Sequence, residues 1–119
     1  MGRRLSLAVA ALGLAVAVGI TDPATAQTPV EVVMVSEFAF APTELTVPAG
    51  LTMFTLNNTD SRRHDMVIAY NETTLQSETL GGGEVGMWEV TLDQAGTYEF
   101  WCSVGNHRER GMTGWLTVQ

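Results

Sequence analysis

The residues best suited to chemistry lie in the C-terminal segment FWCSVGNHRERGMTGWLTVQ (100–119). It contains the only cysteine of the chain, Cys102, and then His107 and Met112 at five-residue intervals. The only other histidine, His64, precedes a segment with apolar residues at alternate positions. A thiolate, two imidazoles and a thioether are together the ligand set of a trigonal His₂Cys copper centre with a long axial methionine.

Taken singly, each of these residues has an ordinary explanation. Met112 could pack in the core, and either histidine could be solvated at a strand end or in a loop. Cys102, however, continues the row of Tyr98 and Phe100 on one face of a strand, so it should point inward where the core meets a loop. That loop can fold back so that its three candidate ligands converge, while His64 comes from a neighbouring strand. Zinc is disfavoured because methionine is a poor zinc ligand, so the pattern predicts one copper ion, cycling between Cu(I) and Cu(II).

The elements that must position these residues are strands. Short segments rich in β-branched and aromatic residues, separated by turn formers, predict an all-β antiparallel sandwich or barrel of about seven strands. The segments are 30–35, 44–50, 51–58, 64–70, 86–92, 96–102 and 114–118. Only 72–80 has a composition that could form a helical turn, with Asn71 as its cap.

Residues 1–26 are typical of a signal peptide. Arg3 and Arg4 precede an uncharged run, 5–20, and Ala24-Thr25-Ala26 is a small-x-small cleavage site. The arginine pair leaves Sec and twin-arginine export open, and the run is long enough to remain as a membrane anchor if it is not cleaved. We expect cleavage, which leaves one domain, 27–119, in the periplasm without stable membrane insertion and as a monomer.

The predicted mature domain is acidic. Removing 1–26 leaves four arginines against twelve carboxylates, a formal charge of −8, and the chain has no lysine. This charge argues against nucleic acid as a partner. The four arginines, Arg62, Arg63, Arg108 and Arg110, all lie beside the two histidines. We therefore expect a positive rim around the metal and a redox partner, donor or acceptor, with an acidic docking surface.

Three segments carry a resemblance to the cupredoxins, the small blue copper proteins of the plastocyanin, azurin and auracyanin kind. They are SEFAFAPTELTVPAG (36–50), NNTDSRRHDMVI (57–68) and AGTYEFWCSVGNHRERGMTGWLTV (95–118). The resemblance implies a Greek-key β-sandwich of about seven to eight strands with copper at one end, and one-electron transfer between larger redox proteins. It makes His64, Cys102 and His107 the equatorial ligands and Met112 the axial one.

The resemblance also implies roles around the ligands. His107 would be the exposed port for electrons, and Asp65 would brace the loop after Cys102. Many relatives have Pro-Gly before the second histidine, where this chain has Gly105-Asn106. Glycine has an N–H that proline lacks, so we expect that of Gly105 to approach the cysteine sulfur.

Two other classes of function use similar residues. A periplasmic copper carrier or store could use the same ligands, although such sites are usually rich in thiols or methionines. An enzyme is disfavoured because a second copper centre needs further histidines, a thiolate-bridged dinuclear site needs a second cysteine, and c-type haem needs a C-x-x-C-H motif.

Overall fold

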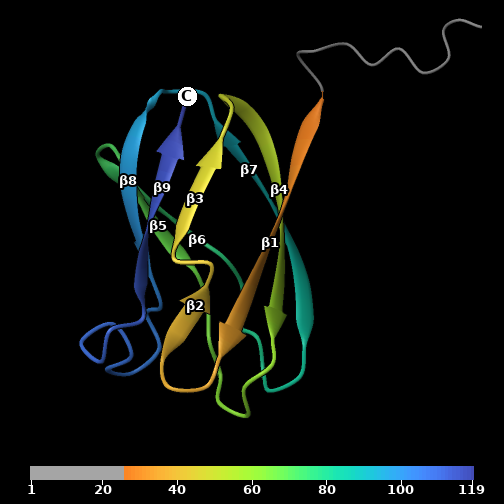
Figure 1. Ribbon diagram of the computed structural model, residues 1–119, viewed down its shortest axis with the longest axis vertical. Coiled ribbons are helices and arrows are strands. Elements are labelled where there is room, and N and C mark those ends of the chain that lie inside the picture. Colours follow the sequence, from red (N-terminus) through yellow and green to blue (C-terminus); the bar gives the residue numbers. More distant parts are fainter. Residues whose placement is uncertain (1–25) are drawn as a thin grey trace, which may run out of the picture.

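The computed structural model describes residues 26–119, and the predicted signal peptide therefore lies almost wholly outside the described residues. The described chain forms nine strands and no helix (Figure 1). The strands are β1 (Gln27–Val35), β2 (Ala39–Ala41), β3 (Glu44–Val47), β4 (Gly50–Asn58), β5 (Val67–Tyr70), β6 (Thr73–Gln76), β7 (Val85–Leu92), β8 (Gly96–Trp101) and β9 (Thr113–Val118).

The strands make two sheets of mixed direction. One sheet has the order β2-β1-β4-β7 and the other β3-β9-β8-β5-β6. The pairs β1–β4 and β3–β9 are parallel and the remaining pairs are antiparallel. The all-β sandwich is thus confirmed, but the expected purely antiparallel pairing is wrong, because β1–β4 and β3–β9 are parallel.

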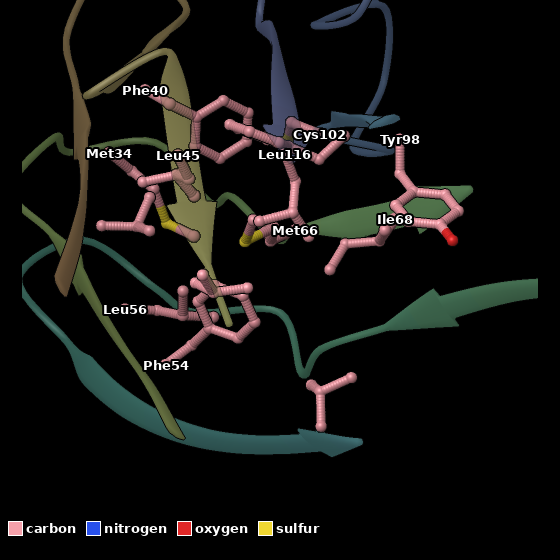
Figure 2. Packing of buried hydrophobic residues seen from close by; sticks show 14 of the residues in the cluster. Met34, Phe40, Leu45, Phe54, Leu56, Met66, Ile68, Tyr98, Cys102 and Leu116 are labelled. Carbon is pink, nitrogen blue, oxygen red and sulfur yellow. The ribbon is translucent and has the colours of Figure 1, made fainter. Parts of the chain in front are cut away.

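The core lies between the inner faces of the sheets, as Figure 2 shows for Phe40, Phe54, Met66 and Leu116. Phe40, Phe54 and Leu116 point inside because successive residues of a strand point to opposite faces, and Met66 lies just before β5. The row predicted for β8 is present: Phe100 and Cys102 are fully buried and Tyr98 nearly so. Cys102 therefore continues the inward-facing row of β8 one residue beyond the end of the strand.

Three details of the expected elements differ in the structure. Residues 72–80 contain no helical turn; β6 pairs there with β5, and Asn71 adopts a positive φ of 56° in the connecting turn. Asparagine tolerates that conformation and threonine favours strands, so a hairpin forms instead. The short strands β2 and β6 raise the number of strands above the seven to eight expected. His64 lies before β5 rather than within it, in an isolated bridge with Leu80.

Candidate metal centre

Three of the four predicted ligands come together at one end of the sandwich. Nδ1 of His64 lies 3.8 Å from Sγ of Cys102, and Nδ1 of His107 lies 3.5 Å from the same sulfur. The three donor atoms all lie within 4.8 Å of one another. Cys102 and His64 are fully buried and His107 is 8% exposed. Two imidazole nitrogens and a sulfur therefore converge in a site largely shielded from solvent.

The loop between β8 and β9 supplies two of these residues and Met112. Figure 1 shows this loop at the end of the sandwich opposite the C-terminus. It is closed at its base, because Cys102 N–H donates to the Met112 carbonyl at 3.1 Å, and Met112 N–H donates to the His107 carbonyl at 3.1 Å. Gly111, with a φ of 103°, supplies the left-handed residue that turns the chain back. Met112 is fully buried, held beside Cys102 through the backbone.

Asp65 braces the loop as expected. Its carboxylate accepts hydrogen bonds from Ser103 N–H at 2.7 Å, the Ser103 hydroxyl at 2.6 Å and the Gln76 side-chain amide at 3.0 Å. Its own backbone N–H donates to Cys102 Sγ at 3.5 Å. Among residues 26–119 the backbone N–H groups that act on the sulfur are those of Asp65 and Val104, and none comes from Gly105. The expected hydrogen bond from Gly105 to the sulfur is therefore not made; Gly105 adopts a left-handed conformation with a φ of 52°.

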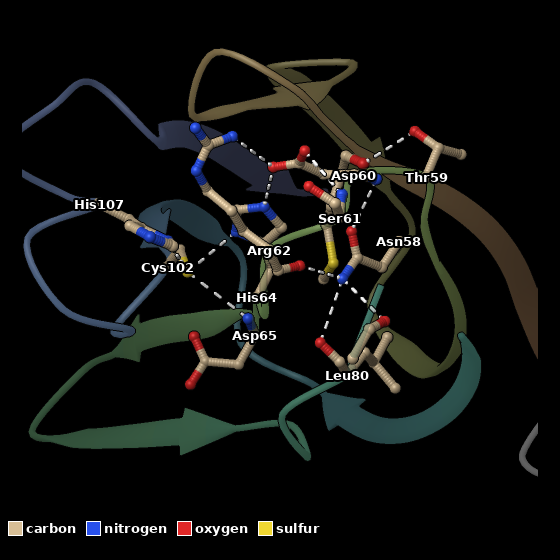
Figure 3. A network of polar contacts seen from close by, with 12 residues as sticks. Asn58, Thr59, Asp60, Ser61, Arg62, His64, Asp65, Leu80, Cys102 and His107 are labelled. Atoms are coloured by element: carbon tan, nitrogen blue, oxygen red, sulfur yellow. Dashed lines mark hydrogen bonds and ion pairs between the residues drawn. The ribbon is translucent and has the colours of Figure 1, made fainter. Parts of the chain in front are cut away.

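The far side of the His64 ring is held by an acid that the sequence did not single out. Nε2 of His64 lies 2.9 Å from Oδ2 of Asp60, and Asp60 is only 7% exposed. Figure 3 shows Asp60 between His64 and Arg62. This contact occupies one ring nitrogen and leaves Nδ1 facing the sulfur. An aspartate four residues before a histidine, both in a loop, has no periodicity that marks the pair in advance.

His107 is covered by an aromatic ring from another loop. The ring of Phe38, in the turn between β1 and β2, meets the imidazole edge-on with centroids 4.9 Å apart. Glu37 and Phe38 both have positive φ values, 71° and 60°, so the turn adopts an uncommon conformation that places this ring. His107 is therefore less exposed than expected. Of the two histidines, however, it is the one that reaches the surface.

The four arginines surround this end, but two of them are paired. Arg62 lies 3.5 Å from Asp60, and Arg108 lies 2.9 Å from Glu99. Arg62 and Arg110 lie over the Phe38 ring, at 4.9 and 4.6 Å from its centroid, and Arg108 lies 3.9 Å over Trp101. In the described part of the chain Arg63 and Arg110 make no ion pair. The rim is thus less positive than the sequence alone implied.

Burial shifts the protonation of the donors in opposite directions. It raises the pKa of the Cys102 thiol, a rise that the backbone N–H groups of Asp65 and Val104 oppose. It lowers the pKa of His107, and the neighbouring positive charges act in the same direction. The hydrogen bond to His64 lowers the pKa of Asp60 below its usual value. The lowered pKa favours the neutral form of the His107 ring, and the Cys102 thiol would release its proton on binding a metal.

The donor set fits copper. A structural zinc site takes four nitrogen or thiolate donors, whereas His64, Cys102 and His107 supply three. Two imidazoles and one thiolate suit copper. Sequence reasoning found the donors but missed Asp60 and Phe38, whose contacts arise only when separate loops meet.

Known proteins match both the sequence and the fold. Residues 8–118 match the cupredoxin-like domain family. The search of curated proteins gave no match. A dithionite-reduced auracyanin from Roseiflexus castenholzii is 26% identical, with 77% of this chain and 97% of that chain covered and a TM-score of 0.70. Auracyanin A, a "blue" copper protein from Chloroflexus aurantiacus, is 22% identical, with 79% and 100% covered and a TM-score of 0.71.

An enzyme also contains a similar domain. The copper-containing nitrite reductase from Thermus scotoductus is 29% identical, with a TM-score of 0.61; the match covers 87% of this chain but 25% of that one. The matched family and the His64, Cys102 and His107 cluster together support one copper ion and a role in electron transfer. Because the sequence match spans nearly the whole chain and the fold and donor cluster agree with it, the chain belongs to the cupredoxin family.

Proposed function

We propose that this protein is an exported, non-enzymatic one-electron shuttle that holds one copper ion through His64, Cys102 and His107, with Met112 as a weak axial donor. The observation that carries the proposal is the convergence of two Nδ1 atoms and one Sγ within 4.8 Å in a buried site. Copper bound to such donors accepts and releases one electron as Cu(II) and Cu(I). The auracyanin A described as a "blue" copper protein supports this reading.

The contribution of the chain is a site that does not rearrange. Asp65 fixes the start of the ligand loop, and the Cys102–Met112 backbone bond closes it. Asp60 fixes the His64 ring from behind. With its donors held from outside, the site should change little between the two charge states, so little reorganisation opposes electron transfer.

Electrons should enter and leave at the His107 end. His107 is 8% exposed and His64 is fully buried, so a partner can approach only the former. Exposed arginines surround this end, whereas the rest of the domain is acidic. We propose donor and acceptor proteins with acidic docking surfaces, engaged chiefly by Arg63 and Arg110 because Arg62 and Arg108 already face carboxylates.

The proposed location is the periplasm, after cleavage behind Ala26. The basis is the sequence pattern of residues 1–26. Among residues 26–119 no helix is long and apolar enough to cross a membrane. The intact mass of protein recovered from the periplasm should correspond to a chain beginning at Gln27, and retention of 1–26 would overturn the cleavage site.

The test of the function is redox chemistry on the copper-loaded protein. We expect one copper per chain, an intense visible band, reversible one-electron voltammetry, and slow loss of copper to a chelator over many cycles. A copper carrier would instead release its metal readily, and an enzyme would turn over a substrate such as nitrite. Either result, or a copper content near two, would overturn the proposal.

A further inference from the structure

Asp60 is a buried acid whose oxygens are both engaged. Oδ2 lies 2.9 Å from Nε2 of His64, and Oδ1 accepts the Ser61 N–H at 2.8 Å. The Asp60 side chain is 5% exposed, and its carboxylate lies directly behind the His64 ring, whose other nitrogen faces Cys102 (Figure 3). Burying a charged carboxylate is costly unless it is paired. The burial of Asp60 beside His64 therefore indicates a role at the metal centre.

We propose that Asp60 is a positioning residue that also sets the reduction potential of the centre, an inference that rests on the proposed function. By accepting the Nε2 proton, Asp60 keeps His64 in the tautomer whose Nδ1 has a free lone pair. The negative charge of Asp60 also makes the imidazole Nδ1 a stronger electron-pair donor to the metal. A stronger anionic environment favours Cu(II) over Cu(I), so Asp60 lowers the reduction potential.

The carboxylate is held in place without help from a metal. Asp60 N–H donates to Oδ1 of the fully buried Asn58 at 3.0 Å. The two N–H groups of the Asn58 amide are shared among three backbone carbonyls, those of Arg62 at 2.8 Å, Gly81 at 3.0 Å and Leu80 at 3.1 Å. Asn58 thus ties the loop carrying Asp60 to the loop before β7.

The same loop holds the backbone of His64. His64 N–H donates to the Leu80 carbonyl at 3.0 Å, and Leu80 N–H donates back at 2.8 Å. Backbone and Asn58 hydrogen bonds to the loop before β7 therefore hold both the His64 ring and the Asp60 carboxylate. Their contact is thus preorganised. Preorganised outer contacts of this kind fix ligand orientation and raise ligand basicity.

Arg62 compensates only part of the Asp60 charge. Its guanidinium lies 3.5 Å from Oδ2, and its side chain is 52% exposed, so water screens it. His64 and Asp60 are shielded by comparison. The buried carboxylate should therefore act on the site more strongly than the exposed cation beside it.

The substitution D60N separates charge from position. Asparagine keeps an oxygen that can accept the Nε2 proton, so D60N should retain copper and colour while its midpoint potential rises. If the substitution weakens Cu(II) binding ten times more than it weakens Cu(I) binding, the midpoint potential rises by ~59 mV for a one-electron couple. D60A removes both charge and acceptor, and its copper affinity should fall about 10–100-fold. R62Q removes the neighbouring positive charge and should shift the potential in the opposite direction by less.

A readout without metal tests the positioning. In metal-free protein at about pH 8, the ¹⁵N shifts of His64 should show the proton on Nε2 in the wild type and D60N, and a mixture of tautomers in D60A. An unchanged potential in D60N would overturn the electrostatic part. A proton on Nδ1 in the wild type, or identical shifts in D60A, would overturn the positioning part. Failure of the proposed function is distinguishable, because the wild type itself would then lack a reversible copper couple.

Discussion

Cys102 and Met112 are both buried sulfur residues of one loop, but they should contribute differently to the centre. A serine hydroxyl is neither soft nor readily deprotonated, so Cys102→Ser should abolish the visible copper–thiolate band. Met112→Leu removes only the weak axial donor and should keep the colour while raising the potential. The exchange conserves volume, so its cost in stability should be below ~1.5 kcal/mol. Absorption spectra and voltammetry check both variants, and a colourless Met112→Leu protein would show that this thioether is essential.

Asp65 offers a separate test at the residue scale, because it contacts the ligand loop rather than a ligand ring. Asp65→Ala leaves the Ser103 N–H and hydroxyl without their acceptor, which should cost about 1–3 kcal/mol and speed copper release. Asp65→Asn keeps one acceptor oxygen, so it should retain part of the stability and part of the slow copper release. Chemical unfolding and chelator competition measure these effects. Unchanged stability and copper retention in Asp65→Ala would mean that the loop holds its shape without this carboxylate.

At the scale of elements, Tyr70 links the end of β5 to the turn between β7 and β8. Its hydroxyl donates to Asp93 Oδ1 at 3.1 Å and accepts Gln94 N–H at 2.8 Å. Burial raises the pKa of this phenol, and the hydrogen bond and negative charge of Asp93 add to the rise. The native state therefore binds the phenol proton more tightly than the unfolded state does.

The sign of the pH dependence follows. The contribution of Tyr70 to stability is fully present below the ordinary phenol pKa of about 10 and is lost as pH rises through the higher native value. Tyr70→Phe should cost about 1 kcal/mol at neutral pH, through the lost hydrogen bonds. The difference in the free energy of unfolding between the wild type and Tyr70→Phe should shrink at strongly alkaline pH. Urea unfolding across that range measures it, and a constant difference would contradict the assigned coupling.

At the scale of the whole molecule, the charges are unevenly placed. All four arginines of 27–119 lie at the metal end, whereas the turn between β7 and β8 lies at the opposite end of β8. Charges at the docking end act on association over about a Debye length, ~8 Å at physiological salt. The two paired arginines should contribute less than Arg63 and Arg110.

Two substitutions with the same change in net charge test this placement. Arg110→Gln removes a positive charge at the metal end, and Gln94→Glu adds a negative charge at the far end while keeping the acceptor for Asn71. With a small anionic oxidant such as hexacyanoferrate, Arg110→Gln should slow electron transfer several-fold at low salt and little at high salt. Gln94→Glu should change the rate far less. Equal effects would show that net charge, and not the rim, governs encounters.

Much of the fold and the donor set could be predicted from the sequence, because both depend on local patterns. Strand alternation placed Cys102 at the end of an inward row, and the residue types and spacing of the C-terminal segment indicated copper. The bracing of the cysteine loop by Asp65 was implied by the resemblance of segment 57–68 to the cupredoxins. The seven main strands followed from β-branched runs and turn residues.

Only the tertiary structure decided how the loops meet. The contact of Asp60 with His64, the cover of Phe38 over His107 and the pairing of Arg108 with Glu99 join residues in loops or on different elements. Loop residues have no periodicity that fixes where their side chains point, and their neighbours depend on the packing of two sheets. Pairing with β5 in the same sheet, together with the strand preference of threonine, made a strand of residues 73–76, where a helical turn was expected.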